Sequence, residues 1–429
     1  MISPAFPRPD RRAASPGPGR FLARILVTDG EQRSSLAAVR SLGRAGHEVL
    51  VCSSRRRPLA GASKHAAATF PVDDPLARPD RFREAVASIM EREGVEVLLP
   101  MTDTSAPLLL ELRQRMPGLL IPFPSRTTYE AISDKDHLME VARGLGVPVP
   151  RQIAVARRTL AGSLRALVDE AFGSEAPVVL KPARSAVVGP RGVERFGVRQ
   201  LDRAADVAAA LEAFPEEAFP ILVQERITGP GLGAFVLADG GCTIATFGHR
   251  RIREKPPTGG VSVYREAVAL RDDVRGHAER ILEAFEWTGV AMVEFKEDAA
   301  TGTPYLMEVN GRFWGSLQLA IDAGVDFPRL LVDRALGRDP GPAVTGRTGI
   351  RSRWLWGDVD HLLWMLRARG DVRAAHPELP SRLGALGRFL VPWRPGDRFE
   401  VLSARDPRPF LRETVQWVAQ LRRKAPLRP

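Results

Sequence analysis

The sequence predicts a protein of mixed α/β and α+β class with more than one domain. Apolar strands and amphipathic helices alternate between Ala23 and Pro124, a pattern typical of a parallel sheet in an α/β layer. From Thr127 the strands and helices continue, but several strands follow one another as hairpins. Residues 289–316 contain two apolar strands joined by a polar turn. At 429 residues the chain is long enough for two or three cores.

The first predicted domain covers residues 22–125. We expect its elements in the order strand 23–29, helix 34–46, strand 47–54, helix 81–94, strand 95–101, helix 105–116 and strand 119–124. The turn after the first strand reads TDGEQRSS. It lacks the G-x-G-x-x-G that lets a backbone approach a pyrophosphate. A dinucleotide-binding domain is therefore disfavoured.

The second predicted domain covers residues 126–340. Ser133 lies three residues before Asp136, which predicts a capped helix over 133–146. The elements that follow are expected as helix 160–172, strand 177–183, a glycine-containing loop at 184–197, helix 202–214, strand 221–227, a hairpin over 233–251 that turns at 239–241, the hairpin over 289–316 and helix 317–337.

The two ends of the chain differ in composition from these domains. Residues 1–21 are rich in Pro and Arg and lack an apolar stretch, so we expect a disordered tail rather than a signal peptide. Residues 341–429 are expected to form a small C-terminal extension. Its Trp-rich segment, 352–370, is interpreted as the core of a small domain, with a membrane-surface helix as the alternative.

Composition narrows the choice of partners and compartment. No run of 18 apolar residues is present, which argues against a membrane span. Cys52 and Cys242 have no metal-binding or redox spacing, so we expect a cytoplasmic protein. The net charge is +11, but the basic residues are scattered and have no interleaved aromatic platform. Nucleic-acid binding is therefore not expected, whereas anionic small molecules should be attracted.

Lysine is rare in this chain. Of 62 basic residues only six are lysines, namely Lys64, Lys135, Lys181, Lys255, Lys296 and Lys424. A chain with this bias should retain lysine where a compact ammonium is needed rather than a planar guanidinium. The lysines inside motif-like segments are therefore candidate site residues.

The most informative motif is the acid and amide set in the 289–316 hairpin. Glu308 and Asn310 lie two apart on one expected strand, so their side chains share a face. A turn through 298–303 would bring Glu294 opposite them. Two carboxylates and an amide oxygen suit Mg²⁺, with Mn²⁺ as an alternative ion. Arg312 follows two residues later and can reach a phosphate oxygen with a bidentate fork.

Three weaker signals precede this motif. Lys181 ends a strand beside the glycine-containing loop, which suits a phosphate cradle as well as an ordinary surface lysine. Lys135 begins a helix, where a cation opposes the helix dipole and should seek an anionic partner. The strand end at 223–227 suits either an edge strand entering a turn or a backbone segment that hydrogen-bonds an adenine edge.

The order and spacing of these motifs resemble the ATP-grasp superfamily. The series is DK, VVLKP, VQERI, EFK and MEVNGR, and it is similar to the branch that includes biotin carboxylase and the carbamoyl-phosphate synthase large chain. The resemblance covers about residues 24–340. It implies an N-terminal parallel α/β (pre-ATP-grasp) domain, a two-lobed ATP-grasp domain and a small C-terminal extension.

The resemblance also implies roles for individual residues. Lys135 and Lys181 would contact ATP phosphates. Gln224, Glu225, Arg226 and Ile227 would form the hinge, with Glu225 taking the adenine amino group or the ribose side. Glu294, Glu308 and Asn310 would hold one or two Mg²⁺ ions, and Arg312 would stabilise the transferring phosphoryl group.

Two stretches need separate comment. The family often binds ribose through a polar side chain shortly after the hinge, and here that stretch is Gly229–Gly233. Residues 249–262 are interpreted as a loop over the reacting carboxylate, with a basic surface loop as the alternative. In the first interpretation Arg250, Arg253 and Lys255 neutralise the acyl phosphate or select an acidic substrate, so that Arg253 and Lys255 join Arg312 as catalytic residues.

The expected function is that of an ATP- and Mg²⁺-dependent ligase. By the resemblance it activates a carboxylate as an acyl phosphate, which an amine attacks. The partners would be small-molecule carboxylates and amines, with a homodimer as one possible assembly. The alternatives are a catalytically inactive nucleotide-binding regulator, or a carboxylase or carbamoyl-type enzyme that uses bicarbonate. The substrate is expected between the strand ends near Asp29–Glu31 and Thr102–Thr104 and the nucleotide cleft.

Overall fold

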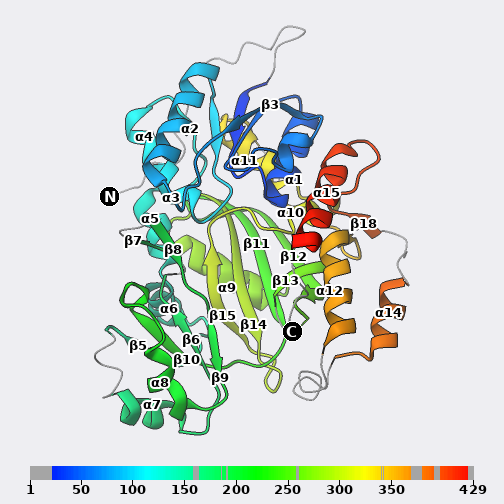
Figure 1. Cartoon of the computed structure of the whole chain (residues 1–429). Helices are drawn as coiled ribbons and strands as arrows, with labels where there is room; N and C mark the ends of the chain where they lie inside the picture. The colour runs from blue at the N-terminus through cyan, green and yellow to red at the C-terminus, as the bar shows by residue number, and fades with distance from the viewer. Residues whose placement is uncertain are drawn as a thin grey trace.

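The computed structural model of the chain describes residues 22–157, 164–184, 186–189, 192–257, 260–339, 341, 343–368, 379–390 and 397–423. The expected tail at 1–21 lies outside the described residues. Figure 1 shows three bodies that follow one another along the chain: an N-terminal α/β layer at the top, a small lobe at the lower left and a large central sheet. The C-terminal helices lie at the right of the large sheet.

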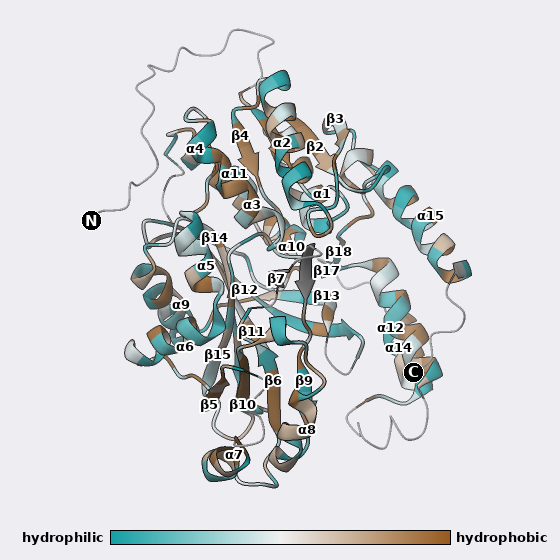
Figure 2. Cartoon of the chain, turned by 60° about the vertical axis from the view of Figure 1, so that its left-hand side comes forward, coloured by the Kyte–Doolittle hydropathy of each residue, from teal (hydrophilic) through white to brown (hydrophobic). Residues whose placement is uncertain are grey.

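The N-terminal layer is built on a four-stranded parallel sheet in the order β3-β2-β1-β4. The prediction of a parallel α/β layer is therefore confirmed. The strands are β1 Arg24–Val27, β2 Glu48–Ser53, β3 Ala66–Pro71 and β4 Val97–Leu99. The helices are α1 Arg33–Arg44, α2 Pro79–Glu93, α3 Ser105–Leu110, α4 Leu112–Arg115 and α5 Arg126–Ser133. Figure 2 shows β2 and β4 in brown, as expected for strands buried between helices.

Three details of this layer differ from the prediction. The segment 119–124 is not a strand: only Leu120 bridges to Val97, because prolines 122 and 124 have no N–H for a ladder. The Arg113 guanidinium instead donates hydrogen bonds to three backbone carbonyl oxygens of this segment. The predicted helix over 105–116 divides into α3 and α4. Strand β3 was not predicted.

The small lobe carries an antiparallel sheet with its own core. Its strands, in the order β5-β10-β6-β9, are β5 Gln152–Val155, β10 Ile221–Glu225, β6 Val178–Pro182 and β9 Arg199–Leu201. The hairpin β7 Ala186–Gly189 and β8 Gly192–Arg195 corresponds to the expected glycine-containing loop, and its tip at 190–191 lies outside the described residues. The helices of the lobe are α7 Leu164–Phe172 and α8 Val207–Leu211, whereas α6 Lys135–Gly144 packs against α5 and the main core. The lobe's buried cluster is separate from the main core, as a two-lobed domain requires.

The cap of α6 was predicted at the wrong residue. Ser133 is the last residue of α5, and its hydroxyl donates to the carbonyl oxygen of Tyr129. Asp134 is the N-cap, and its carboxylate accepts hydrogen bonds from the backbone N–H groups of Asp136 and His137. The helix therefore begins at Lys135.

The large sheet is the centre of the molecule. Its strands are β15 Pro304–Asn310, β14 Gly289–Glu297, β11 Gly231–Asp239, β12 Cys242–Lys255, β13 Val261–Val268, β17 Arg351–Arg353 and β18 Asp397–Phe399, with β16 Val344–Thr345 paired to β12. Helices α9 Asp272–Ala284, α10 Leu317–Asp322 and α11 Phe327–Ala335 pack beside it. One continuous core joins this sheet to the N-terminal layer.

Two predictions for this region were wrong. Residues 249–255 belong to β12 and residues 261–262 to β13, so most of the expected loop over the substrate is the end of a β-hairpin. Thr258 and Gly259 lie outside the described residues. The single helix expected over 317–337 is interrupted at Gly324, whose positive φ of 101° ends the first helical segment.

The C-terminal extension connects the other bodies. Its helices are α12 Leu355–Arg367, α14 Arg382–Leu390 and α15 Arg408–Arg423. Trp356 of α12 stacks on Trp417 of α15 with ring centroids 4.2 Å apart. The side chains of Arg40 and Asp406 form an ion pair at 2.9 Å that is only 4% exposed on each side. The extension is therefore docked on the N-terminal layer by a buried charge pair.

Among the helices that the structure describes, none has both the length and the apolar character that a membrane span requires.

We expect Asp406→Asn to destabilise the protein by about 3 kcal/mol, because it leaves the Arg40 guanidinium buried without its carboxylate. Calorimetric unfolding would measure the change. Asp73→Asn is the matched control, since Asp73 pairs with Arg78 and their side chains are 34% and 59% exposed, and exposed pairs contribute about 0–1 kcal/mol. Equal stability of the two variants would contradict the docking role of the Arg40–Asp406 pair.

Stability should also fall as the pH rises from about 5 to about 7. Burial raises the pKa of Glu413 from 4.5 to about 7, despite the hydrogen bond from Trp354. At a pH between these two values the Glu413 carboxyl is ionised in the unfolded protein but protonated in the folded protein. The free energy of unfolding therefore falls by up to about 3 kcal/mol as the pH rises through this range. Glu413→Gln should remove this part of the pH dependence of the melting temperature, and an unchanged profile would contradict it.

Candidate functional site

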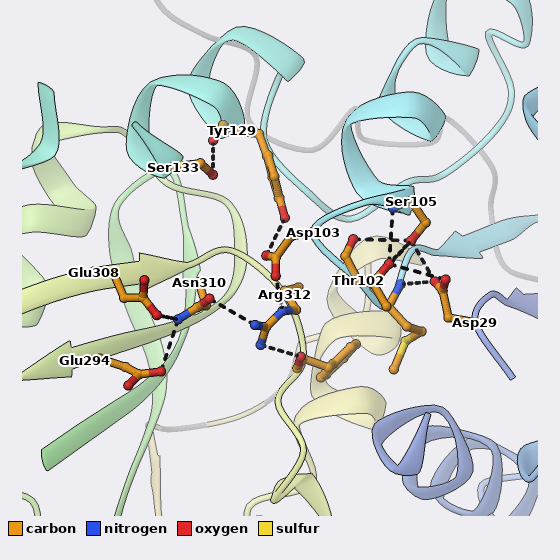
Figure 3. A network of polar contacts seen from close by, with 12 residues as sticks. Asp29, Thr102, Asp103, Ser105, Tyr129, Ser133, Glu294, Glu308, Asn310 and Arg312 are labelled. Carbon is orange, nitrogen blue, oxygen red and sulfur yellow. Dashed lines mark hydrogen bonds and ion pairs between the residues drawn. The ribbon is translucent and has the colours of Figure 1, made fainter. Parts of the chain in front are cut away.

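Two carboxylates face each other on the β14–β15 hairpin. The register pairs Glu294 directly with Glu308, and Met292 with Asn310. The amide nitrogen of Asn310 donates to Glu294 Oε1 and to Glu308 Oε1, each at 3.2 Å. Figure 3 shows the three side chains converging in front of the strands. The predicted hairpin and the predicted approach of these three residues are present in the structure.

The pKa values of the two carboxyls are shifted in opposite directions. Burial, followed by repulsion from Glu308, raises the pKa of Glu294 to about 7. Burial also opposes ionisation of Glu308, but Lys135 and the hydrogen bond from Asn310 outweigh it and hold its pKa below the usual value. Glu308 is therefore the member of the pair that ionises at the lower pH.

The donor set fits a divalent cation. Two carboxylates are close to what Mg²⁺ takes from a protein when substrate phosphates supply the remaining oxygens, and the Asn310 amide would join them through its oxygen only after turning away from Arg312. A cation would also offset the repulsion that raises the Glu294 pKa. The described part of the chain has no cluster of three or more His, Cys, Asp or Glu residues suited to a metal. The hairpin set therefore depends on the amide and on outside ligands for its further oxygens.

Two lysines approach this pair, Lys135 from α6 beside the main core and Lys181 from the small lobe. Lys135, the first residue of α6, lies with its Nζ 3.4 Å from Glu308 Oε2, which supplies the anionic partner expected from its position. Lys181 on β6 is buried, and its Nζ donates to the carbonyl oxygen of Met307 at 3.4 Å. Burial, and then the charge of Lys135, lower the pKa of Lys181 to about 8.

The four hinge residues lie at the end of β10, between the small lobe and the large sheet. The Gln224 amide donates to Gln152 Oε1 at 3.0 Å. The Glu225 carboxylate accepts from the backbone N–H and the Nε of Arg151, and the Arg226 guanidinium donates to Asp202. The Ile227 side chain is buried. The Glu225 carboxylate is thus engaged with Arg151, whereas the prediction placed it against adenine or ribose.

Arg312 connects the hairpin to the N-terminal layer. Its Nη2 donates to Asn310 Oδ1 at 3.0 Å, and its Nε donates to Asp103 Oδ2 at 2.8 Å. Asp103 also accepts from the Tyr129 hydroxyl at 3.3 Å. These contacts form the middle of the polar network in Figure 3. Asp103 was not among the predicted site residues, although it lies in the segment 102–104 proposed for the substrate.

A second group of polar residues lies where β1 and β4 end. The buried Asp29 accepts hydrogen bonds from Ser105 Oγ at 2.7 Å and from Thr102 Oγ1 at 3.3 Å. The φ of Asp29 is 51°, in the left-handed region that few residues other than glycine adopt. In parallel sheets, ligands bind outside the carboxyl ends of the strands. The network therefore reaches from the carboxylate pair to such an edge.

On β12, the arginine that reaches the carboxylate pair is Arg251. Its Nη2 lies 3.3 Å from Glu294 Oε2, and its Nη1 donates to Glu254 at 3.0 Å. Arg253 instead forms two hydrogen bonds with Asp358 of α12, at 2.6 and 2.7 Å, and Lys255 pairs with Asp360. The structure thus brings together Lys135, Glu294, Glu308, Asn310 and Arg312, but it holds Arg253 and Lys255 against α12.

Glycine at the hinge allows close contact with the hairpin turn. The backbone N–H of Ala299 donates to Thr228 O at 2.8 Å, and that of Glu297 donates to Pro230 O at 2.9 Å. A Cβ on Gly229 would lie 2.0 Å from the Glu297 carbonyl oxygen, and the φ of Gly229 is 146°. The stretch without a polar ribose ligand therefore fixes the hinge against the strand that carries Glu294.

The fold and the motifs agree with the comparisons to known proteins. A family model described as "ATP-grasp in the biosynthetic pathway with Ter operon" matches residues 217–357. This match agrees with the resemblance to the ATP-grasp superfamily found in the sequence. No curated protein sequence matched the chain.

Several solved structures share the fold at low sequence identity. A biotin carboxylase complex from Campylobacter jejuni has a TM-score of 0.59 at 18% identity, over 74% of this chain and 71% of that one. An L-amino acid ligase from Bacillus licheniformis gives 0.55 at 16%, over 74% and 75%. The biotin carboxylase domain of a Hydrogenobacter thermophilus 2-oxoglutarate carboxylase, in complex with MgADP and bicarbonate, gives 0.60 at 17%, over 77% and 74%.

We expect Gly229→Ala to destabilise the protein by about 1–3 kcal/mol, because the new methyl group must push the hinge away from the hairpin turn. Gly302→Ala, in the hairpin turn that Gly229 contacts, is the matched control: its φ is also positive, at 70°, but nothing lies within 4 Å of its added Cβ. Urea unfolding of both variants separates the steric clash from backbone strain. Identical losses would mean that the close contact contributes nothing.

Proposed function

We propose that this chain is an ATP- and Mg²⁺-dependent ligase that activates a carboxylate as an acyl phosphate and joins it to an amine. The observation that carries the proposal is the Glu294–Glu308 pair with Lys135 on one side and Arg312 on the other. This combination places cation ligands, a phosphate-binding ammonium and a guanidinium at one site. Phosphoryl transfer requires positioning and charge neutralisation rather than covalent chemistry from the protein.

In this proposal the nucleotide lies between the small lobe and the large sheet. The hinge residues Gln224, Glu225, Arg226 and Ile227 hold the base, and Lys135 and Lys181 contact phosphate oxygens. With a pKa of about 8, Lys181 is readily kept protonated by a bound phosphate. Mg²⁺, held by Glu294, Glu308 and Asn310, would neutralise charge on the β- and γ-phosphates.

The carboxylate substrate binds between this cleft and the ends of β1 and β4. Arg312 lies between the two regions, in contact with Asn310 on one side and Asp103 on the other. It can therefore orient the acceptor carboxylate and stabilise the phosphoryl group during transfer. Bond formation between the carboxylate oxygen and the γ-phosphorus releases ADP, and attack by the amine on the acyl carbon then releases phosphate.

Arg251 extends the set of site residues beyond the sequence prediction. Its contact with Glu294 favours the ionised form of a carboxyl that burial disfavours. We assign it a positioning role toward the cation ligand. Arg253 and Lys255 were proposed from the sequence as catalytic residues. They contact acidic side chains of α12, so we assign them to holding β12 against α12 and not to contacts with the reacting groups.

Related folds suggest what the substrates and the assembly could be. One neighbour is described as an L-amino acid ligase, and another is a carboxylase domain dimer with bicarbonate. Amino acids are therefore the first candidates for the acid and the amine, with bicarbonate as the competing acid. A homodimer is a reasonable assembly to test by light scattering.

The test is substrate-dependent release of ADP and phosphate from MgATP in the presence of pooled carboxylic acids and amino acids, with bicarbonate in a separate reaction. We expect Glu308→Gln to lower the rate about 100-fold or more, because a cation at this position contributes several kcal/mol. Glu297→Gln is the matched control on the paired strand β14, since Glu297 pairs with Arg271 at the surface.

The outcomes separate the candidate functions. Turnover that requires both an acid and an amine supports the ligase, whereas turnover with bicarbonate alone favours the carboxylase. Tight MgATP binding without turnover in any pool would favour a regulatory nucleotide-binding protein. A wild-type rate in Glu308→Gln would overturn the assignment of the cation ligands.

A further inference from the structure

A strongly basic hollow is lined in part by Arg251, the residue that also contacts Glu294 of the carboxylate pair. It has a volume of about 640 Å³ and is bordered by β12, β13, β17 and α14. Five of its lining residues are arginines, Arg250, Arg251, Arg253, Arg351 and Arg388, and Tyr264 forms part of its wall. Its volume is within the range of small-molecule sites, about 300–1,000 Å³.

The register of the sheet places this pocket behind the candidate active site. Glu294 pairs with Gly233, which pairs with His249, which pairs with Ala267, so these four residues face one side. Glu266 is the neighbour of Ala267 and faces the other side. Its carboxylate accepts from Arg250 and from Arg351, at 2.7 and 2.6 Å. The pocket arginines bound to Glu266 therefore lie on the reverse face from Glu294.

The acids around the pocket leave positive charge uncompensated. Glu266 is shared by two arginines, Arg250 and Arg351. Asp358, which is fully buried, is likewise shared by Arg253 and Arg353. A third acid, Asp397, accepts from the Tyr264 hydroxyl. Each shared carboxylate balances one of its two guanidinium charges, and Arg388 adds a further exposed cation.

Arg253, at the base of the pocket, is held by several contacts, whereas Arg250, at its rim, is largely exposed to solvent. Arg253 makes two hydrogen bonds to Asp358 and lies 4.5 Å from the centre of the Tyr264 ring. The Arg250 side chain, by contrast, is 64% exposed. Planar guanidinium forks match the oxygens of carboxylate and phosphate groups. An excess of such forks around one hollow suits a ligand with at least two anionic groups.

We propose that this reverse-face pocket binds a small polyanion with two or more phosphate or carboxylate groups, at a site separate from the nucleotide cleft. Because β12 carries both Arg250 and Arg251, the same strand borders this pocket and contacts Glu294. The pocket is thus suited to an effector rather than to the reacting substrate.

The test is calorimetric titration of the full chain with pyrophosphate and, separately, with citrate, both without Mg²⁺. We expect saturable binding of one or both probes with a Kd below about 1 mM. The double variant R250A/R388A should weaken it about tenfold or more. This variant should fold, because both mutated side chains are exposed. Glu266 keeps its ion pair with Arg351, and Asp358 keeps both of its arginines. The two probes distinguish phosphate from carboxylate ligands.

Two further variants make the result decisive. R78A/R329A removes the same charge from exposed positions elsewhere, with side chains 59% and 62% exposed, and should bind the probes like wild type. Lys181→Met alters the proposed nucleotide cleft and should leave probe binding unchanged. The proposal is overturned if wild type shows no saturable binding, if R78A/R329A weakens binding as much as R250A/R388A, or if binding is lost in Lys181→Met instead.

Discussion

The placement of Glu294 directly opposite Glu308 on neighbouring strands is the constraint on which the rest of the site depends. Two half-buried carboxylates at this spacing repel each other, and this repulsion adds to desolvation in raising the pKa of Glu294. Positive charges and hydrogen bonds from the surrounding elements offset this repulsion. Helix α6 contributes Lys135, β12 contributes Arg251, and Asn310 donates to both acids. Three elements that are separate in the sequence therefore place stabilising groups around the same two carboxylates.

Much of the fold could be predicted from local patterns. Continuous apolar strands and amphipathic helices identified β1, β2, β4 and the helices between them, because such patterns belong to single elements. Strand β3 has the sequence AAATFP and lies at the edge of the sheet, where alanine gives little strand signal. The opposite error occurred at 119–124, whose apolar residues are interrupted by prolines. Sequence pattern thus failed where backbone hydrogen bonding, rather than hydrophobicity, decided the structure.

In the site, too, residues close together in the sequence could be predicted, whereas contacts between distant segments could not. Glu294, Glu308, Asn310 and Arg312 lie within 19 residues of each other, so one hairpin prediction was enough to assemble them. Asp103 contacts Arg312 across 209 residues, a separation that no local pattern spans. The error at β12 has a different cause. Irregular register between Arg251 and Arg253 changes which side chains face the cleft, and a shift of one residue in a strand exchanges its two faces.

The docking of the C-terminal extension has a consequence for how the chain is made. Arg40 is buried in helix α1, yet its carboxylate partner Asp406 is 366 residues further along, and its guanidinium also donates to the carbonyl oxygens of Glu400 and Val401. During synthesis Arg40 leaves the ribosome long before Asp406, so its guanidinium has no carboxylate partner until that residue has been made. The N-terminal layer therefore gains its buried ion pair only after the C-terminal extension has been synthesised and docked.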